Sequence, residues 1–189
     1  CCFEILLDPE EYINKVIQAE DEDARSGMFE EQSGDEDGSL NLGNINNGTW
    51  SRYNGVDLVD DSAMRFRVAR PGGRRDGWVE VYLGTPGEST ANILAGTPVG
   101  KVEVPVTGNW QVYETIEACI DSGGGTYDVV LRFAGGGSAQ GSALFNLNWF
   151  SVGSPESAMV LERGITYGGS SAFSDGEFAS DKTPLLPGQ

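Results

Sequence analysis

The sequence contains no histidine among its 189 residues. Histidine is the base of Ser-His-Asp triads and Cys-His dyads and a frequent ligand of zinc and iron. No glycine-rich phosphate loop follows a strand pattern and opens a helix, so nucleotide binding has no support. Carboxylates are so numerous that a glycosidase pair could be chosen anywhere, and we therefore assign none. The residues indicate that the chain is not an enzyme.

Long apolar runs are also missing. No stretch approaches the roughly 18 consecutive apolar residues of a membrane-spanning helix, and no signal peptide is visible. The three cysteines, Cys1, Cys2 and Cys119, are an odd number, which excludes a complete disulfide framework. Cys119 lies in an apolar stretch, so we expect a buried thiol. A start at Cys1-Cys2 fits a fragment, a processed chain or a lipid-anchored protein of the cell surface.

Basic residues are scarce relative to acidic ones. Twelve Lys and Arg stand against 29 Asp and Glu, for a net charge of -17. Such a surface repels phosphate backbones and anionic membranes, so we expect no nucleic-acid partner. The acidic residues favour solubility, and some of them are candidates to bind a hard cation such as calcium.

Glycine is plentiful, at 27 residues, and it separates short stretches of alternating apolar and polar residues. The alternation is clear at 64–68, 79–83 and 127–133, where it is typical of half-buried strands. Turn signals such as Pro71-Gly72-Gly73 and Thr85-Pro86-Gly87 lie between the stretches. Short strands punctuated in this way predict an all-β sandwich or barrel.

The two flanks differ in composition from the rest. Residues 1–15 form a lead-in, in which Asp8 and Pro9 indicate the start of a short helix. Residues 154–189 are rich in Ser and Gly and read as a linker or C-terminal extension. We expect this extension to have no hydrophobic core of its own. Both flanks are candidates for contact with a neighbouring domain or subunit.

Several segments resemble, in order and spacing, carbohydrate-binding module family 6. They are Ile17-Gln18-Ala19-Glu20-Asp21, Ser26-Gly27, NLGNINNGTWSRY at 41–53, Arg65-Phe66-Arg67-Val68-Ala69, VPVTGNWQ at 104–111 and FNLNWF at 145–150. The resemblance covers residues 16–153. It implies a jelly-roll β-sandwich of two antiparallel sheets, for which we expect Phe66 and Trp149 to be buried. It also implies an extracellular module that targets a secreted glycoside hydrolase to a polysaccharide.

The resemblance also implies a sugar cleft made of Glu31, Asn44, Trp110 and Asn146. Trp110 would stack on a sugar ring, while Glu31 and Asn146 would hydrogen-bond to its hydroxyl groups. Without the resemblance, Asn146 could equally be an amide that holds backbone. Asn44 departs from the family, which usually has an aromatic wall there. Either the site is weaker, or Tyr53 or Tyr113 supplies the wall, or the cleft no longer binds sugar.

A second binding surface is implied on the concave face of one sheet, where Trp50 and Tyr82 match. Trp50 fits a packed sheet residue equally well. For structural calcium the matching ligands are Gln18, Glu20, the carbonyl of Leu40 and Asn148. Many family members carry Asp where Asn148 stands, and an amide oxygen can still ligate calcium with less charge.

The alternative function is a structural or adhesive extracellular protein. In that case the sandwich is reused, the flanks contact neighbouring subunits and the sugar cleft is vestigial.

Overall fold

The computed structural model describes residues 15–36, 38–59, 62–73, 75–136 and 143–153, so the expected N-terminal helix and the extension at 154–189 lie outside the described residues. The described residues form strands with two short helical turns. In chain order these are β1 (Lys15–Gln18), η1 (Ala19–Asp21, a 3-10 turn), β2 (Ala24–Ser26), β3 (Phe29–Gln32), β4 (Leu40–Gly43), β5 (Trp50–Leu58), β6 (Ala63–Ala69), β7 (Gly77–Gly84), α1 (Thr90–Ala95), β8 (Gly100–Val104), β9 (Glu114–Cys119), β10 (Gly125–Gly135) and β11 (Asn146–Gly153).

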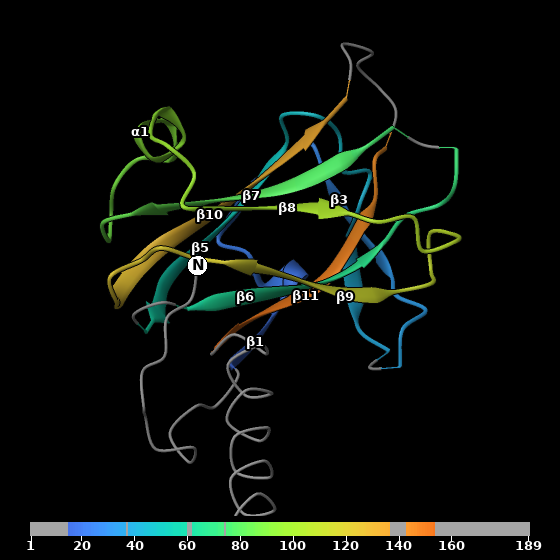
Figure 1. The fold of residues 1–189 in the computed structure, drawn as a ribbon, viewed down its shortest axis with the longest axis horizontal. Coiled ribbons are helices and arrows are strands. Elements are labelled where there is room, and N and C mark those ends of the chain that lie inside the picture. Colours follow the sequence, from blue (N-terminus) through green and yellow to red (C-terminus); the bar gives the residue numbers. More distant parts are fainter. Residues whose placement is uncertain (1–14, 37, 60–61, 74, 137–142, 154–189) are drawn as a thin grey trace, which may run out of the picture. The chain divides into compact units, whose positions relative to one another are not determined.

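The strands form two antiparallel sheets. The six-stranded sheet has the order β3-β4-β11-β6-β9, with β1 also paired to β11, and the five-stranded sheet has the order β2-β5-β10-β7-β8. In Figure 1, β7, β8 and β10 lie above β6, β9 and β11. The predicted sandwich of two antiparallel sheets is confirmed. Neither described helix is long and apolar enough to cross a membrane.

One hydrophobic cluster joins the inner faces of both sheets. It contains Phe66 and Phe150 from the six-stranded sheet and Leu131 and Phe133 from the five-stranded sheet. Tyr53 of β5 meets Phe150 of β11 edge to face, with ring centroids 4.7 Å apart. The burial predicted for Phe66 is confirmed, since its side chain is 0% exposed. Removing these side chains from water supplies most of the drive to fold.

Two burial expectations need correction. Cys119 is exposed, because it points away from the core at the end of edge strand β9, while its neighbour Ala118 points inward. Trp149 is only partly buried, whereas the next residue, Phe150, enters the core. In both cases the period-two alternation of a strand decides which neighbour faces inward.

Strand β7 is buried on both faces near α1, against the alternation that its sequence predicts. Val79 and Val81 face the main core, yet Glu80 and Tyr82 are only 9% and 4% exposed. The reason for Tyr82 is α1, whose Ile93 packs with Tyr82 and Val130 in a second small cluster. Ser89 marks the start of this helix, because serine is a favoured N-cap residue. In the structure its hydroxyl accepts a hydrogen bond from the Asn92 N–H.

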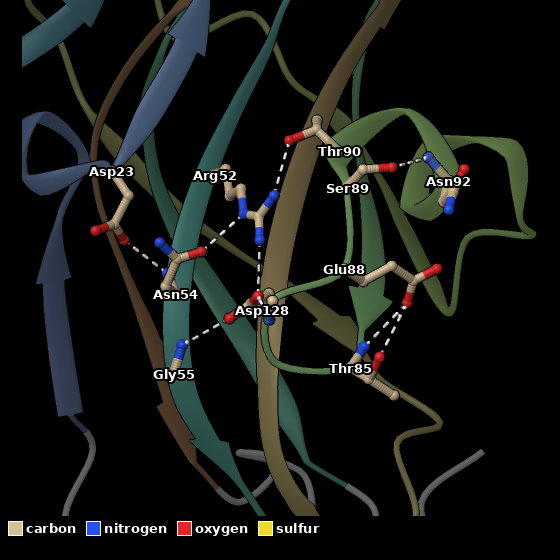
Figure 2. A network of polar contacts seen from close by, with 11 residues as sticks. Asp23, Arg52, Asn54, Gly55, Thr85, Glu88, Ser89, Thr90, Asn92 and Asp128 are labelled. Atoms are coloured by element: carbon tan, nitrogen blue, oxygen red, sulfur yellow. Dashed lines mark hydrogen bonds and ion pairs between the residues drawn. The ribbon is translucent and has the colours of Figure 1, made fainter.

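A buried carboxylate ties the β7–α1 loop to the sheet (Figure 2). Asp128 lies at an irregularity in β10 and accepts hydrogen bonds from the N–H groups of Gly55 and Gly87 and from Arg52. Burial by itself raises the pKa of Asp128, but these three donors outweigh it and hold the pKa below its ordinary value. Arg52 also donates to Thr90 at the start of α1. The network thereby holds α1 against β10.

Candidate functional site

Three of the four predicted cleft residues come together on the outer face of the six-stranded sheet. They are Glu31 from β3, Asn146 from β11 and Trp110 from the β8–β9 connection. The Asn146 amide nitrogen donates to a Glu31 carboxylate oxygen over 2.6 Å and to the backbone carbonyl of Trp110 over 3.0 Å. Asn146 is 1% exposed. Both of its N–H groups are therefore used inside the protein, and a sugar hydroxyl can accept from this amide only by replacing one of these bonds.

Two amides hold the Glu31 carboxylate in place, and the neighbouring Gly43 leaves room for it. The Asn41 amide donates to the same Glu31 oxygen over 3.2 Å. The carboxylate lies over Gly43, where a Cβ atom would come within 2.7 Å of the Glu31 carboxyl carbon. Within the described residues no Lys or Arg nitrogen forms an ion pair with Glu31. Its charge thus remains available to hydroxyl donors.

The loop that carries Trp110 is closed by a local hydrogen bond and tied to the protein through Gln111. Asn109 accepts a hydrogen bond from the Gln111 N–H, and the Gln111 side chain accepts from the Gly34 N–H over 2.6 Å and from the Tyr113 hydroxyl over 3.2 Å. Trp110 itself is partly buried. The sequence gives no sign of the contact between Gln111 and Gly34, because these residues are 77 positions apart.

Asn44 has a backbone reason to differ from the family's aromatic. Its φ angle is 54°, in the left-handed region that Asn tolerates better than bulky residues do. Neither proposed replacement offers a ring face to solvent, because Tyr53 is 2% and Tyr113 8% exposed. Burial raises the pKa of both phenols. A second aromatic wall must therefore come from another residue, or be absent.

The second surface predicted at Trp50 and Tyr82 lies on the outer face of the five-stranded sheet. Tyr82 is buried beneath Ile93 of α1 and cannot serve as an open stacking platform. Trp50 is partly buried and packs at the edge of the same cluster. Tyr82 therefore drops out of the candidate sugar site.

Three charged side chains line up with Trp50 across this second face, an arrangement that the sequence analysis did not predict. Cross-strand pairing aligns Trp50 with Arg132, Arg132 with Glu80 and Glu80 with Lys101. The Lys101 ammonium lies 3.0 Å from the Glu80 carboxylate and Arg132 lies 3.9 Å from it. Since the four residues come from different strands, only the register brings them together. Glu80, unlike Glu31, already has two cationic partners.

The predicted calcium ligands lie around η1, which packs against β4 and β11. A Glu20 carboxylate oxygen accepts from the Leu40 N–H over 3.1 Å. The Ser39 hydroxyl lies within hydrogen-bonding distance of both the Leu40 carbonyl, at 3.1 Å, and the Asn148 amide oxygen, at 2.9 Å. The side-chain oxygen of Gln18 is buried and has no hydrogen-bond donor among the residues that the structure describes. The four predicted ligands thus belong to one neighbourhood.

The surroundings of Asn148 explain why it is an amide rather than a carboxylate. Its nitrogen donates to Asp35 over 3.1 Å. Asp35 also forms two hydrogen bonds with the Arg67 guanidinium, at 2.7 and 2.8 Å. The Arg67 contact, helped by Asn148, lowers the pKa of Asp35. A carboxylate at 148 would face the charge of Asp35 instead of donating to it.

The donor set fits a hard cation, though with little charge. All four groups offer oxygen, as calcium requires, but Glu20 is the one carboxylate among them. Within the described part of the chain, no three Cys, Asp or Glu side chains converge as a metal-binding group. Calcium would therefore be held mainly by amide and carbonyl oxygens.

The chain is similar to proteins with known structures. A β-1,3-glucan-binding module from Bacillus halodurans is 36% identical, with a TM-score of 0.62, and the match covers 75% of this chain and 96% of that one. A family 6 module from Clostridium cellulolyticum, solved with xylose, is 31% identical with a TM-score of 0.60, covering 75% and 98% of the two chains.

Curated relatives are longer proteins. The clotting factor G alpha subunit of Tachypleus tridentatus is 29% identical over 74% of this chain and 18% of its own length. Endo-1,4-beta-xylanase A of Thermoclostridium stercorarium is 29% identical over 71% of this chain and 23% of its own length. The chain thus spans about a fifth of the curated relatives it matches. The family model described as "Carbohydrate binding module (family 6)" matches residues 18–154, so the chain belongs to that family of carbohydrate-binding modules.

Proposed function

We propose that this chain binds a polysaccharide, without cleaving it, at the surface formed by Glu31 and Trp110. The observation that carries this proposal is the Glu31 carboxylate, which two amides hold over Gly43 and which pairs with no Lys or Arg among the described residues. Asn146 positions this carboxylate relative to the Trp110 loop through its two hydrogen bonds.

The chemistry of a sugar ring suits this arrangement. Its CH groups form apolar faces that pack on an aromatic ring, and its edges carry hydroxyl donors. Hydrogen bonds to a carboxylate are stronger than those between neutral groups. One ring can therefore contact the face of Trp110 while its hydroxyls donate to Glu31.

We infer β-1,3-glucan as the first glycan to test and xylan as the second. The relatives described as a β-1,3-glucan-binding module and a xylanase support this order. Isothermal titration of the protein with β-1,3-glucan, xylan and agarose, in calcium, should give measurable binding to at least one of them.

A conservative change tests the site within the same titration. Glu31→Gln keeps the shape of the side chain and should weaken binding about tenfold, since a charged acceptor becomes neutral. Glu103→Gln, an exposed position on β8 of the other sheet, is the matched control. Equal loss in both variants would assign the effect to net charge, and no loss in Glu31→Gln would remove Glu31 from the site.

We also propose that calcium stabilises the module through Gln18, Glu20, the Leu40 carbonyl and Asn148. The support for this assignment is the buried Gln18 oxygen, for which the described part of the chain provides no donor. The ion would supply charge neutralisation for Glu20 and would join η1 to β4 and β11. None of the proposed sugar-binding residues is a ligand in this set.

We further propose that the module is extracellular and directs a glycoside hydrolase to its substrate. The support is that the relatives include a xylanase and an arabinoxylan arabinofuranohydrolase in which the matched segment is a minor part. The missing aromatic at Asn44 favours one alternative, a structural or adhesive protein with a vestigial site. Absence of binding to every glycan tested would favour that alternative.

A further inference from the structure

We propose that Phe29, rather than a residue at position 44, forms the second aromatic wall of the sugar site. This inference rests on the proposed function. It adds a specificity-determining residue that the sequence pattern did not reveal.

Phe29 is exposed in a way that packing does not explain. It is 49% exposed, and it belongs to neither cluster of buried hydrophobic residues. The other large apolar side chains that are exposed in the described residues are all valines. Phe29 also lies on β3, at the edge of its sheet, where an exposed apolar side chain invites unwanted pairing. An aromatic kept there calls for a binding role.

The register places Phe29 beside the Glu31 carboxylate. Phe29 is paired with Gly43, and Glu31 with Asn41. Residues two apart in a strand share a face, so Phe29 and Glu31 point to the same side of the sheet. Gly43 has no side chain, and the carboxylate of Glu31 occupies the space above it. Phe29 therefore flanks that carboxylate on the side of the sheet edge.

Asn146 flanks the same carboxylate on the other side. Leu42 is paired with Leu147, so one step along this antiparallel ladder Gly43 lies beside Asn146. Asn146 in turn holds the backbone of Trp110. Phe29 on β3 and Asn146 on β11, which holds the Trp110 loop, thus lie on opposite sides of the Glu31 carboxylate, with β4 between the two strands.

The spacing suits one sugar ring. Phe29 and Asn146 are two strand spacings apart, or roughly 10 Å between backbones. A pyranose ring with an aromatic face on each side needs about 3.5–4 Å on either side, or about 7–8 Å between the two aromatic rings. The candidates considered from the sequence do not provide this wall: Tyr53 and Tyr113 are buried, and Asn44 has no ring.

The test is titration of the full chain with β-1,3-glucan and xylan, using Phe29→Ala, Phe29→Tyr and Trp110→Ala. Phe29→Ala should raise Kd about tenfold, whereas Phe29→Tyr, which keeps the ring, should stay within about twofold of the wild type. Val59→Ala is the control, because Val59 is 42% exposed and lies in the β5–β6 connection. All four variants should melt close to the wild type.

The outcomes separate this inference from the proposed function. If Trp110→Ala loses binding while Phe29→Ala binds like the wild type, the Phe29 wall is refuted and the proposed site stands. Equal loss in Phe29→Ala and Phe29→Tyr refutes a role for the ring. If the wild type binds none of these glycans, both proposals are refuted.

Discussion

The outer faces of the two sheets carry similar residue types, but the glutamates on them have different partners. On the six-stranded sheet, Glu31 is held by amides and stands next to an exposed Phe29 and a partly buried Trp110. On the five-stranded sheet, Glu80 is neutralised by Lys101 and Arg132. Glu31 thus keeps its charge available and Phe29 stays exposed, whereas Glu80 is paired with two cations and Tyr82 is buried.

The difference shows that residue type alone does not identify a binding face. Tryptophan and glutamate occur on both. What distinguishes them is whether the carboxylate already has cationic partners and whether an element such as α1 covers the rings. A carboxylate whose charge is already neutralised by cations gains less from the hydroxyl donors of a ligand than one held only by amides.

Calcium should stabilise the six-stranded sheet more than the five-stranded sheet. Its gain in the free energy of unfolding is the largest effect that we expect. All four proposed ligands lie on β1, η1, β4 or β11. Calcium at about 100 times its Kd should add roughly 2.7 kcal/mol to the free energy of unfolding. Thermal melting with calcium and with a chelator measures the total.

Hydrogen exchange localises the calcium effect. Chelation should deprotect β1 and β4 more than β8 of the other sheet. Uniform loss across both sheets would contradict a local staple, and identical melting with and without calcium would contradict the site itself.

Replacing Trp110 and, separately, Trp50 by alanine compares sugar binding at the two faces directly. Trp110→Ala should cost about 2 kcal/mol of binding free energy, or roughly thirtyfold in Kd, because it removes the main stacking surface. Trp50→Ala should change Kd by less than about twofold. The reverse result, with Trp50→Ala abolishing binding and Trp110→Ala silent, would move the site to the five-stranded sheet.

Adding a methyl group at Gly43 should weaken sugar binding although no aromatic residue is changed. Gly43→Ala places a Cβ 2.7 Å from the Glu31 carboxyl carbon, so the carboxylate must leave its two amides. We expect Kd to rise about tenfold. Stability should also fall by about 1 kcal/mol, because the buried Asn41 and Asn146 amides lose an acceptor. Gly72→Ala is the control, since its nearest neighbour would be a Val106 methyl at 3.8 Å. Unchanged affinity in Gly43→Ala would show that the position of Glu31 is not critical.

The Asp35–Arg67 pair should give the smallest effect, of about 1 kcal/mol in stability. Because the pKa of Asp35 is lowered in the folded state, its contribution is fully present above the unfolded pKa. It is lost as pH falls through the lower folded value. The stability difference between wild type and Asp35→Asn should therefore be constant from about pH 5 to 8 and shrink below about pH 4. Urea unfolding across this range measures it, and a difference that grows on acidification would contradict the assignment.

Much of the candidate site was predicted from the family resemblance, because ordered segments of the sequence carry its residues. Glu31, Trp110 and Asn146 each lie in or near a recognisable run, and the structure brings them together. Phe29, Glu80 and Arg132 could not be read in this way. Each gains its meaning from a cross-strand partner, and a single sequence does not state the register.

Alternation and turn residues are local properties of the chain, and by themselves they determined the all-β class. The two-sheet sandwich, its expected extent over 16–153 and the candidate cleft came from the resemblance of ordered sequence segments to a family. Only the tertiary structure decided which faces stay open. Burial of Tyr82 depends on Ile93 of a helix that packs against it, and placement of the Glu31 carboxylate depends on the absent side chain of Gly43. Packing between segments distant in sequence settles such questions, since exposure is a property of the neighbours and not of the residue.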